Sequence, residues 1–157
     1  MILLPYNRRP ALEGALPEAT LDYLQNVGVP EHLELQGLYF VFDLTFRPCL
    51  SGDALEIGDV DQGFLSVALQ RNTGFMGHFI PESPTPEFLF SNSSIEQFVL
   101  CVGATERLWE MEKTNLVRWE MRWKVLEDEI RRIDPLVLST PENSWVTMIG
   151  ELQDGII

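Results

Sequence analysis

The chain has 157 residues, of which 45% are hydrophobic and 22% charged, and we expect one globular domain over residues 1–157. Its 24 acidic and 11 basic residues leave a formal charge of −13. This charge excludes direct binding to a nucleic-acid backbone, because such binding requires Lys and Arg to displace counterions. With no transmembrane run and an apolar start that stops at Pro5, far too short for an export signal, we expect a cytoplasmic protein.

The acidic residues are unevenly distributed along the chain. Residues 106–134 contain eight acidic and seven basic side chains, whereas the rest of the chain contains 16 acidic and four basic ones. The part of the chain outside residues 106–134 therefore has a formal charge of −12, which would attract a basic partner and raise the association rate at low salt. Solubility alone explains the same charge without a partner.

The first part of the chain predicts an extended lead-in, a helix and two strands. Residues 1–15 are expected to be extended. Pro17 starts a short helix, which ends before Pro30. Residues 35–46 are rich in Tyr, Phe, Val and Thr and predict a strand over residues 37–44. Its apolar residues on both faces are typical of a central position. Residues 54–58 predict a further short strand.

A hairpin is predicted in the middle of the chain. Apolar side chains alternate over residues 63–70, and a second strand pattern covers residues 75–80. Between them, Asn72, Thr73 and Gly74 tolerate a positive φ, which a tight turn requires. These two strands are followed by a third short strand and a helix. Ser93 and Glu96 have the spacing of a capping box at the start of that helix, which we expect to continue to about Glu112.

A break at Thr114 and Asn115 is expected to precede a second long helix, which Asp134 and Pro135 end. One face of this helix follows spacings of three and four residues and is predicted to be buried. Its members are Leu116, Trp119, Trp123, Leu126, Ile130 and Ile133. Residues 144–152 predict a last short helix that carries Trp145, Met148 and Ile149.

Taken together, the patterns predict an α+β domain. A small, mainly antiparallel sheet from residues 37–90 has one helix before it and two or three helices after it. The connection PESPTPE at residues 81–87 contains three prolines and is expected to be an exposed loop or edge, because proline cannot donate to a sheet ladder. This connection is either a binding loop or an inert spacer.

Three segments in order carry a resemblance to a known family. IGDVDQGFLSVAL at residues 57–69, NTGFMGHF at 72–79 and FLFSNSSIEQFVLCV at 88–102 together resemble the SUKH superfamily of immunity and regulatory proteins, and are closest to its fourth subfamily. The resemblance implies a non-enzymatic immunity protein of a bacterial polymorphic toxin system. Its partner would be a cognate toxin domain, typically an intracellular nuclease or nucleic-acid deaminase. A regulatory or scaffold protein of the same fold, with a cellular partner, is the alternative.

No catalytic, cofactor or metal site is predicted from the sequence. Asp59 and Asp61 begin like a calcium loop, but the glycine falls at the fifth position instead of the sixth, and the twelfth position is Gln70 instead of Glu. Phosphate-binding, dinucleotide-binding and nucleophile-elbow motifs are lacking from the sequence. A hydrolase that uses two surface carboxylates is a third, more distant alternative.

The cysteines and histidines do not form a recognisable pair. Cys101 falls on the apolar side of a predicted helix, which argues against a nucleophile, and Cys49 falls in a loop, so both are expected to be reduced thiols. His78 is expected to be a partly exposed sheet residue on the same side as Met76 and Ile80.

The tryptophans allow two interpretations. Trp119, Trp123 and Trp145 would form an aromatic platform for a base or sugar if they were exposed. The helical spacing of Trp119 and Trp123 favours burial in the core instead.

The predicted partner-binding surface is the exposed face of the sheet with its acidic loops. Four carboxylates fall within nine residues around one predicted strand, and the family resemblance points to recognition on the sheet side. The candidate partner-binding residues are Asp53, Glu56, Asp59, Asp61 and His78. The expected partner is a protein toxin with a basic surface.

Overall fold

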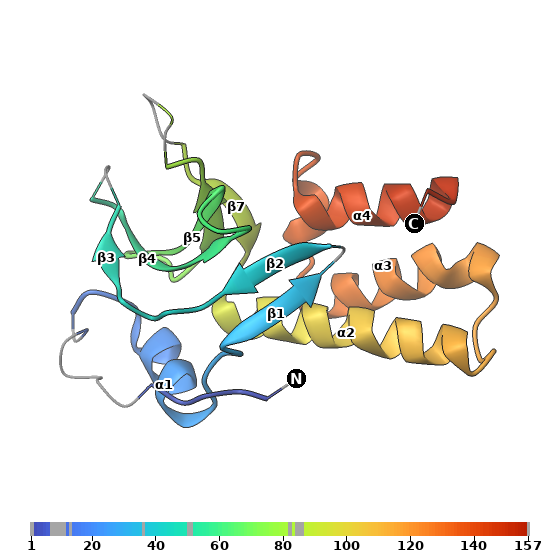
Figure 1. The fold of residues 1–157 in the computed structure, drawn as a ribbon, viewed down its shortest axis with the longest axis horizontal. Helices are drawn as coiled ribbons and strands as arrows, with labels where there is room; N and C mark the ends of the chain where they lie inside the picture. The colour runs from blue at the N-terminus through green and yellow to red at the C-terminus, as the bar shows by residue number, and fades with distance from the viewer. Residues whose placement is uncertain are drawn as a thin grey trace. The chain divides into compact units, whose positions relative to one another are not determined.

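The computed structural model describes residues 2–6, 12, 14–35, 37–49, 52–81, 83 and 87–156. Its architecture is α+β, as predicted (Figure 1). The chain divides into two compact units, Met1–Phe90 with Ser94–Glu96, and Ser91–Ser93 with Gln97–Ile157. We call them the sheet unit and the helical unit. The single domain over residues 1–157 stays a prediction.

The sheet unit begins with helix α1 and continues into the sheet. Helix α1 (Glu18–Asn26) follows Pro17, as the sequence predicts, and it buries Leu21 and Leu24. Among the described residues, seven strands form an antiparallel sheet in the order β1-β2-β4-β5-β6-β7, with β3 paired to β4. The strands are β1 (His32–Leu35), β2 (Leu38–Val41), β3 (Arg47–Pro48), β4 (Ala54–Val60), β5 (Leu65–Gln70), β6 (Met76–Phe79) and β7 (Leu89–Asn92).

The predicted hairpin is confirmed as β5 and β6. Ser66 lies opposite Phe79, and the two strands pair without a register shift. In the turn, the backbone N–H of Gly74 donates to the carbonyl oxygen of Gln70 at 2.8 Å, and Gly74 has a φ of 72°. A glycine adopts this left-handed conformation at low cost, which explains why the Asn-Thr-Gly sequence marks the turn.

The strand predicted over residues 37–44 is shorter in the structure, and strand β1 was not predicted. Strand β2 ends at Val41, and Leu44 and Phe46 have φ values of 50° and 52°, which a continuing strand does not allow. Strand β1 pairs with β2 at the edge of the sheet, so β2 lies inside the sheet as predicted. Strand β4 extends to Val60, two residues beyond its predicted end.

The proline-rich connection and the lead-in are only partly covered. Residues 82 and 84–86 lie outside the described residues, and so do residues 1, 7–11 and 13. Within the lead-in, Leu4 forms an isolated antiparallel bridge with Val29. The prediction of an exposed loop at 81–87 therefore falls largely outside the described part of the chain.

The helical unit contains helix α2 (Ile95–Lys113) from Gln97 on, together with α3 (Arg122–Ile133), α4 (Ser144–Asp154) and 3-10 turns at Trp119–Met121 and Val137–Ser139. Helix α4 is capped at its start by Asn143, whose side chain accepts a hydrogen bond from the backbone N–H of Trp145 at 2.9 Å. It ends at Gly155, which has a φ of 71°. The predicted ends of α2 and α3 and the predicted last helix are confirmed.

The predicted buried face of the second long helix is wrong at its first two positions. Helix α3 begins at Arg122, and Leu126 and Ile130 are buried as expected. Leu116 and Trp119 instead lie in the connection before the helix, where 75% and 60% of their surfaces are exposed. The spacing argument assumed one continuous helix. The predicted break is present, because Asn115 is left-handed, but the extended Arg118 moves the start of the helix on to Arg122.

A buried polar network holds the helical unit together. Asp134, at the C-terminal end of α3, accepts hydrogen bonds from the Nδ2 of Asn92 (3.2 Å), the backbone N–H of Ser93 (2.7 Å) and the hydroxyl of Ser93 (2.7 Å). Asn92 in turn accepts a bond from the indole Nε1 of Trp145 at 2.9 Å. The predicted helix start at Ser94 is one residue early, because α2 begins at Ile95, which places Ser94 and not the predicted Ser93 directly before the helix.

Candidate partner-binding face

The register of the sheet places two of the predicted site residues together. Residues directly opposite in an antiparallel pair point to the same face. Asp59 lies opposite Ser66, and Glu56 lies opposite Ala68. Ser66 and Ala68 are two residues apart on β5 and share a face. Glu56 and Asp59 therefore lie on one face of the sheet, although a register shift separates them on β4.

His78 points to the opposite face. It lies opposite Val67, which falls between Ser66 and Ala68 on β5. The side chain is half-buried, as predicted for a sheet histidine, and burial lowers its pKa below 6.5. The imidazole is therefore neutral at pH 7. The structure thus separates His78 from the carboxylates with which the sequence grouped it.

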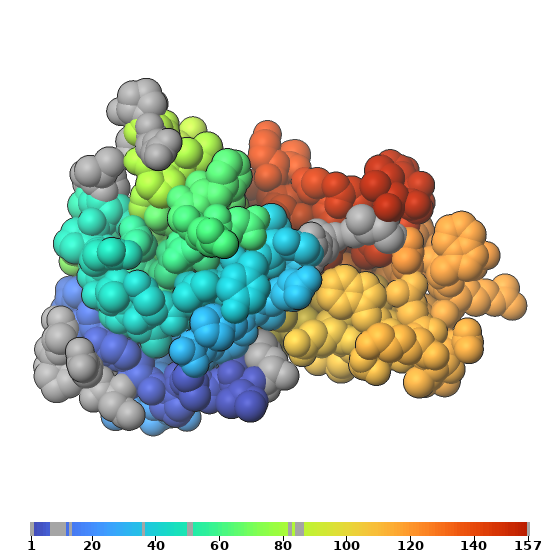
Figure 2. Space-filling view, in the orientation of Figure 1, coloured from blue at the N-terminus to red at the C-terminus, as the bar shows by residue number. Residues whose placement is uncertain are grey.

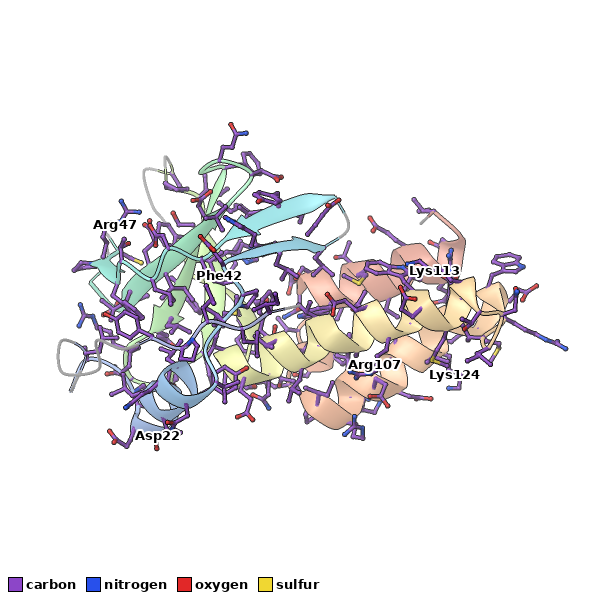
Figure 3. All side chains as sticks on the ribbon, turned by 60° about the horizontal axis from the view of Figure 1, so that its bottom comes forward. Asp22, Phe42, Arg47, Arg107, Lys113 and Lys124 are labelled. Carbon is purple, nitrogen blue, oxygen red and sulfur yellow. The ribbon has the colours of Figure 1, made fainter. Side chains whose placement is uncertain are left out.

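Asp53 and Glu56 lie near the start of β4. The backbone carbonyl of the exposed Asp53 accepts a hydrogen bond from the N–H of Arg71 at 2.9 Å. Glu56 accepts a hydrogen bond from the Nη2 of Arg47 at 2.6 Å, and the same nitrogen lies 3.6 Å from Asp43. Arg47 projects from β3 at the periphery of the sheet unit (Figure 3). The Glu56 carboxylate is therefore already paired with a cation of its own chain.

Asp59 and Asp61 shape the turn between β4 and β5. An Oδ1 atom of Asp59 accepts a hydrogen bond from the N–H of Gly63 at 2.9 Å. Asp61 and Tyr39 exchange two bonds of 2.8 Å, from Tyr39 N–H to the Asp61 Oδ1 and from Asp61 N–H to the Tyr39 carbonyl. A carboxylate has about four acceptor positions, so both side chains keep capacity for a further donor.

The face that carries Asp59 continues onto β2 and β1. Asp59 lies opposite Val41, Val41 lies opposite His32, and Tyr39 lies opposite Glu34. These five residues therefore point to one side, and we call them the β1–β2 face. Atoms of both strands lie at the surface of the sheet unit (Figure 2).

Aromatic side chains are displayed on this face and beside it. The Tyr39 ring stacks on His32 with ring centroids 5.7 Å apart, and 45% of Tyr39 is exposed. Phe64, in the β4–β5 turn, is 66% exposed. Farther along the sheet the same face is closed, because Ala68 and Phe79 are buried in a small apolar cluster. Among the described residues, the open part of this face is therefore the part on β1, β2 and the end of β4.

Sequence reasoning missed the residues that β1 contributes, His32 and Glu34. The available signal was the alternation of His32 and Glu34 with the apolar Leu33 and Leu35, which is the pattern of a half-buried strand. Four residues are too short a run to stand out in a sequence. Tyr39 was placed in a strand, but its face follows only from the register.

No cluster of three or more His, Cys, Asp or Glu side chains that could hold a metal ion occurs in the part of the chain that the structure describes. Within the same residues, none of the helices has the length and apolar character to cross a membrane. Cys49 and Cys101 are both free thiols.

Both thiols are expected to react slowly with alkylating reagents. Burial, followed by the nearby Glu56 carboxylate, raises the pKa of Cys49 to about 11, and burial, followed by Asp134, raises the pKa of Cys101 to about 12. The thiolate is the reactive form, so at pH 8 a pKa of 11 instead of 9 leaves about 100-fold less of it. We expect iodoacetamide to modify Cys49 about 100-fold more slowly than glutathione, and Cys101 only after unfolding. A Cys49→Ser variant separates the two sites by mass spectrometry, and alkylation of Cys49 at the glutathione rate would contradict the prediction.

A family model described as SUKH-4 immunity protein matches residues 7–151 of the chain. No curated protein matches the sequence. No solved structure matches it either.

Proposed function

The chain belongs to the SUKH-4 immunity protein family, and from this premise we propose that it binds and neutralises a cognate toxin domain that acts on nucleic acid, as a nuclease or a nucleic-acid deaminase. It would do so as part of a bacterial polymorphic toxin system and in the cytoplasm, where such a toxin meets its substrate. The protein acts by binding in this proposal and has no turnover of its own.

The observation that carries the toxin class is the charge of the sheet unit. Its sequence contains 13 acidic and four basic residues, a balance of −9, and one of the basic residues, Arg47, is paired with Glu56. An enzyme that acts on nucleic acid needs a basic channel for the phosphate backbone. Acidic side chains that enter such a channel compete with the substrate for the same Lys and Arg residues.

The β1–β2 face combines the two kinds of residue that such an interface uses. Asp59 and Glu34, with Asp61 in the adjacent turn, supply negative charge, which steers a basic partner and raises the association rate. Tyr39 supplies a large aromatic surface of the kind that forms interface hot spots. We propose this face as the centre of contact, with Asp53 and Glu56 farther along β4 as peripheral carboxylates. His78, on the opposite face, has no direct role in the proposal.

A regulatory or scaffold protein of the same fold, with a basic cellular partner, is the second candidate, because the acidic face suits any basic protein. Co-purification with the product of the neighbouring gene separates the two candidates. The immunity role is supported if the neighbouring gene encodes a large secreted protein with a variable C-terminal toxin domain and this protein is captured. Capture of a housekeeping protein instead supports regulation.

The charges on the proposed face are expected to control the association rate. We expect Asp59→Asn/Asp61→Asn to slow association with the captured toxin domain severalfold at low salt and to have little effect at 0.5 M salt (a concentration of about three times physiological ionic strength). The asparagine oxygens can still accept the bonds from Gly63 and Tyr39, so the turn is retained. Stopped-flow kinetics at both salt concentrations measure the effect.

The matched control removes two exposed aspartates from the helical unit, Asp128→Asn/Asp154→Asn, and is expected to leave association nearly unchanged. Tyr39→Ala is expected to raise the dissociation rate about 30-fold or more, because the loss of a hot-spot side chain acts mainly on dissociation. Equal slowing by both aspartate pairs would move the interface away from this face.

A further inference from the structure

The connection between α2 and α3 displays large apolar side chains that the fold does not bury. Leu116, Trp119 and Met121 fall within six residues and are 75%, 60% and 47% exposed. Tryptophan is highly buried on average in folded proteins, so a tryptophan that is 60% exposed is an unusual feature of this connection. The structure therefore reopens the alternative in which Trp119 is a binding platform instead of a core residue.

The connection is held in a defined conformation. The backbone N–H of Leu116 donates to the carbonyl of Met111 at 2.8 Å, and the N–H of Met121 donates to the carbonyl of Arg118 at 2.9 Å. Trp119 extends past Gly155 at the end of α4, since a Cβ placed on that glycine would lie 3.8 Å from the indole ring. One side of the ring is thereby supported within the helical unit, while most of the ring remains in solvent.

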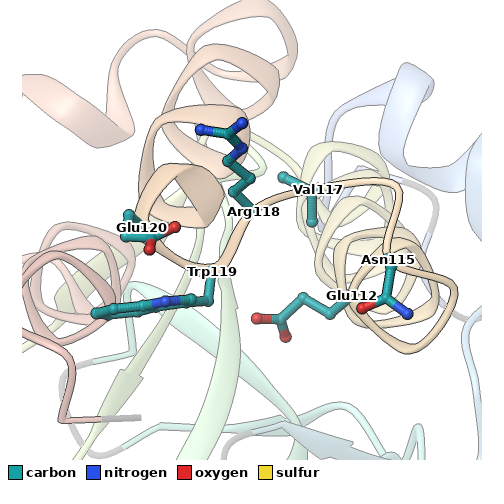
Figure 4. A pocket seen from close by; sticks show the side chains of 6 residues that line it. All are labelled: Glu112, Asn115, Val117, Arg118, Trp119 and Glu120. Carbon is teal, nitrogen blue, oxygen red and sulfur yellow. The ribbon is translucent and has the colours of Figure 1, made fainter.

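A hollow of about 490 Å³ lies beside the ring. It is lined by Glu112, Asn115, Val117, Arg118, Trp119 and Glu120 (Figure 4). The carboxylate of Glu112 and the ring of Trp119 lie on the same side of the connection, whereas the guanidinium of Arg118 points away from them (Figure 4). Arg122 Nη1 donates to Glu112 at 3.2 Å and holds that carboxylate in place.

The chemistry of the hollow selects among possible occupants. An aromatic face next to carboxylates attracts a cation, because the negative face of the ring and the carboxylate charge act together. Glu120 and the net charge of −13 repel a nucleotide phosphate, whereas the charge of Glu112 is already balanced by Arg122. The same net charge opposes docking of a second copy of this chain.

We propose that the Trp119 hollow binds an arginine or lysine side chain of a partner polypeptide. The cation lies over the indole of Trp119, and the carboxylate of Glu120, which also lines the hollow, supplies the negative charge. This surface belongs to the helical unit and does not depend on the proposed toxin or on the β1–β2 face.

The test uses the full-length protein labelled with ¹⁵N and an acetylated, amidated tetra-arginine peptide as the probe. The indole N–H resonance of Trp119, assigned with Trp119→Phe, is expected to shift saturably with peptide, while the resonance of the buried Trp145 stays in place. Glu120→Gln is expected to weaken binding at Trp119 about two- to fivefold, the range of one cation–π or exposed charge contact. Asp128→Asn, an equal loss of charge at an exposed site on α3, is the matched control and is expected to have no effect.

Four results would overturn the proposal. The Trp119 resonance does not move with tetra-arginine, or it moves equally in Glu120→Gln and Asp128→Asn, which indicates non-specific attraction to an acidic protein. Alternatively, it shifts on dilution of the protein alone, which identifies self-association, or with adenosine monophosphate instead of the peptide, which identifies a base platform.

Discussion

Replacing Trp145 with alanine is expected to reduce the free energy of unfolding by about 3–5 kcal/mol, the usual cost of removing a buried aromatic side chain. Trp145 is almost fully buried, its ring lies 6.2 Å from that of Phe98, and its indole N–H donates to Asn92. The alanine variant loses the packing and leaves the side-chain oxygen of Asn92 without that donor. Urea unfolding followed by circular dichroism measures the difference.

Trp119→Ala is the matched control, because it removes the same side chain from an exposed position. We expect it to cost less than about 1 kcal/mol, in the range of surface substitutions. Trp123, which is half-buried on α3, is expected to fall between the two. Equal losses in the free energy of unfolding for Trp119→Ala and Trp145→Ala would mean that Trp119 is buried in solution.

Replacing Asp134 with alanine is expected to cost about 3 kcal/mol, because three donors lose their acceptor in a buried site. Those donors, on Asn92 and Ser93, come from the residues just before α2, 41 and 42 positions earlier in the sequence. The carboxylate therefore ties the end of α3 to Asn92 and Ser93. Thermal and urea unfolding of the variant measure the loss.

Asp134→Asn keeps one acceptor oxygen and is expected to cost about half as much as Asp134→Ala. Asp128→Asn, at an exposed position on the same helix, is expected to change stability by under about 0.5 kcal/mol. Because Asp134 and Trp145 both bond Asn92, their effects are expected not to add in the double variant. Additive costs would show that the two contacts are independent and that no network couples them.

Local sequence patterns were sufficient for much of the fold. The turn residues up to Gly74 located the β5–β6 hairpin, and prolines located the start of α1 and the end of α3. Such signals act over a few neighbouring residues, so they can be interpreted without knowing which segments pack against them. They failed where an element was very short, as for β1, or where a helical spacing crossed a break, as at Trp119.

The candidate site was predicted less completely than the fold. The sequence pointed to the carboxylates around β4, and the structure places Glu56 and Asp59 on one face of the sheet. It also places His78 on the other face and adds Tyr39 to the face of Asp59. Which side chains share a face depends on strand register, and a shift between Glu56 and Gly58 alters that register within β4.

By itself, the sequence determined the α+β class, the order of most elements, the acidic character and the family, because these depend on composition and on short patterns. Only the tertiary structure decided that Trp119 is displayed while Trp145 is buried, and that Asn92 and Asp134 form one buried network. The physical reason is that burial and hydrogen-bond partners are set by contacts between residues some 40 or 50 positions apart. No local pattern of apolar or polar residues encodes which distant segments meet.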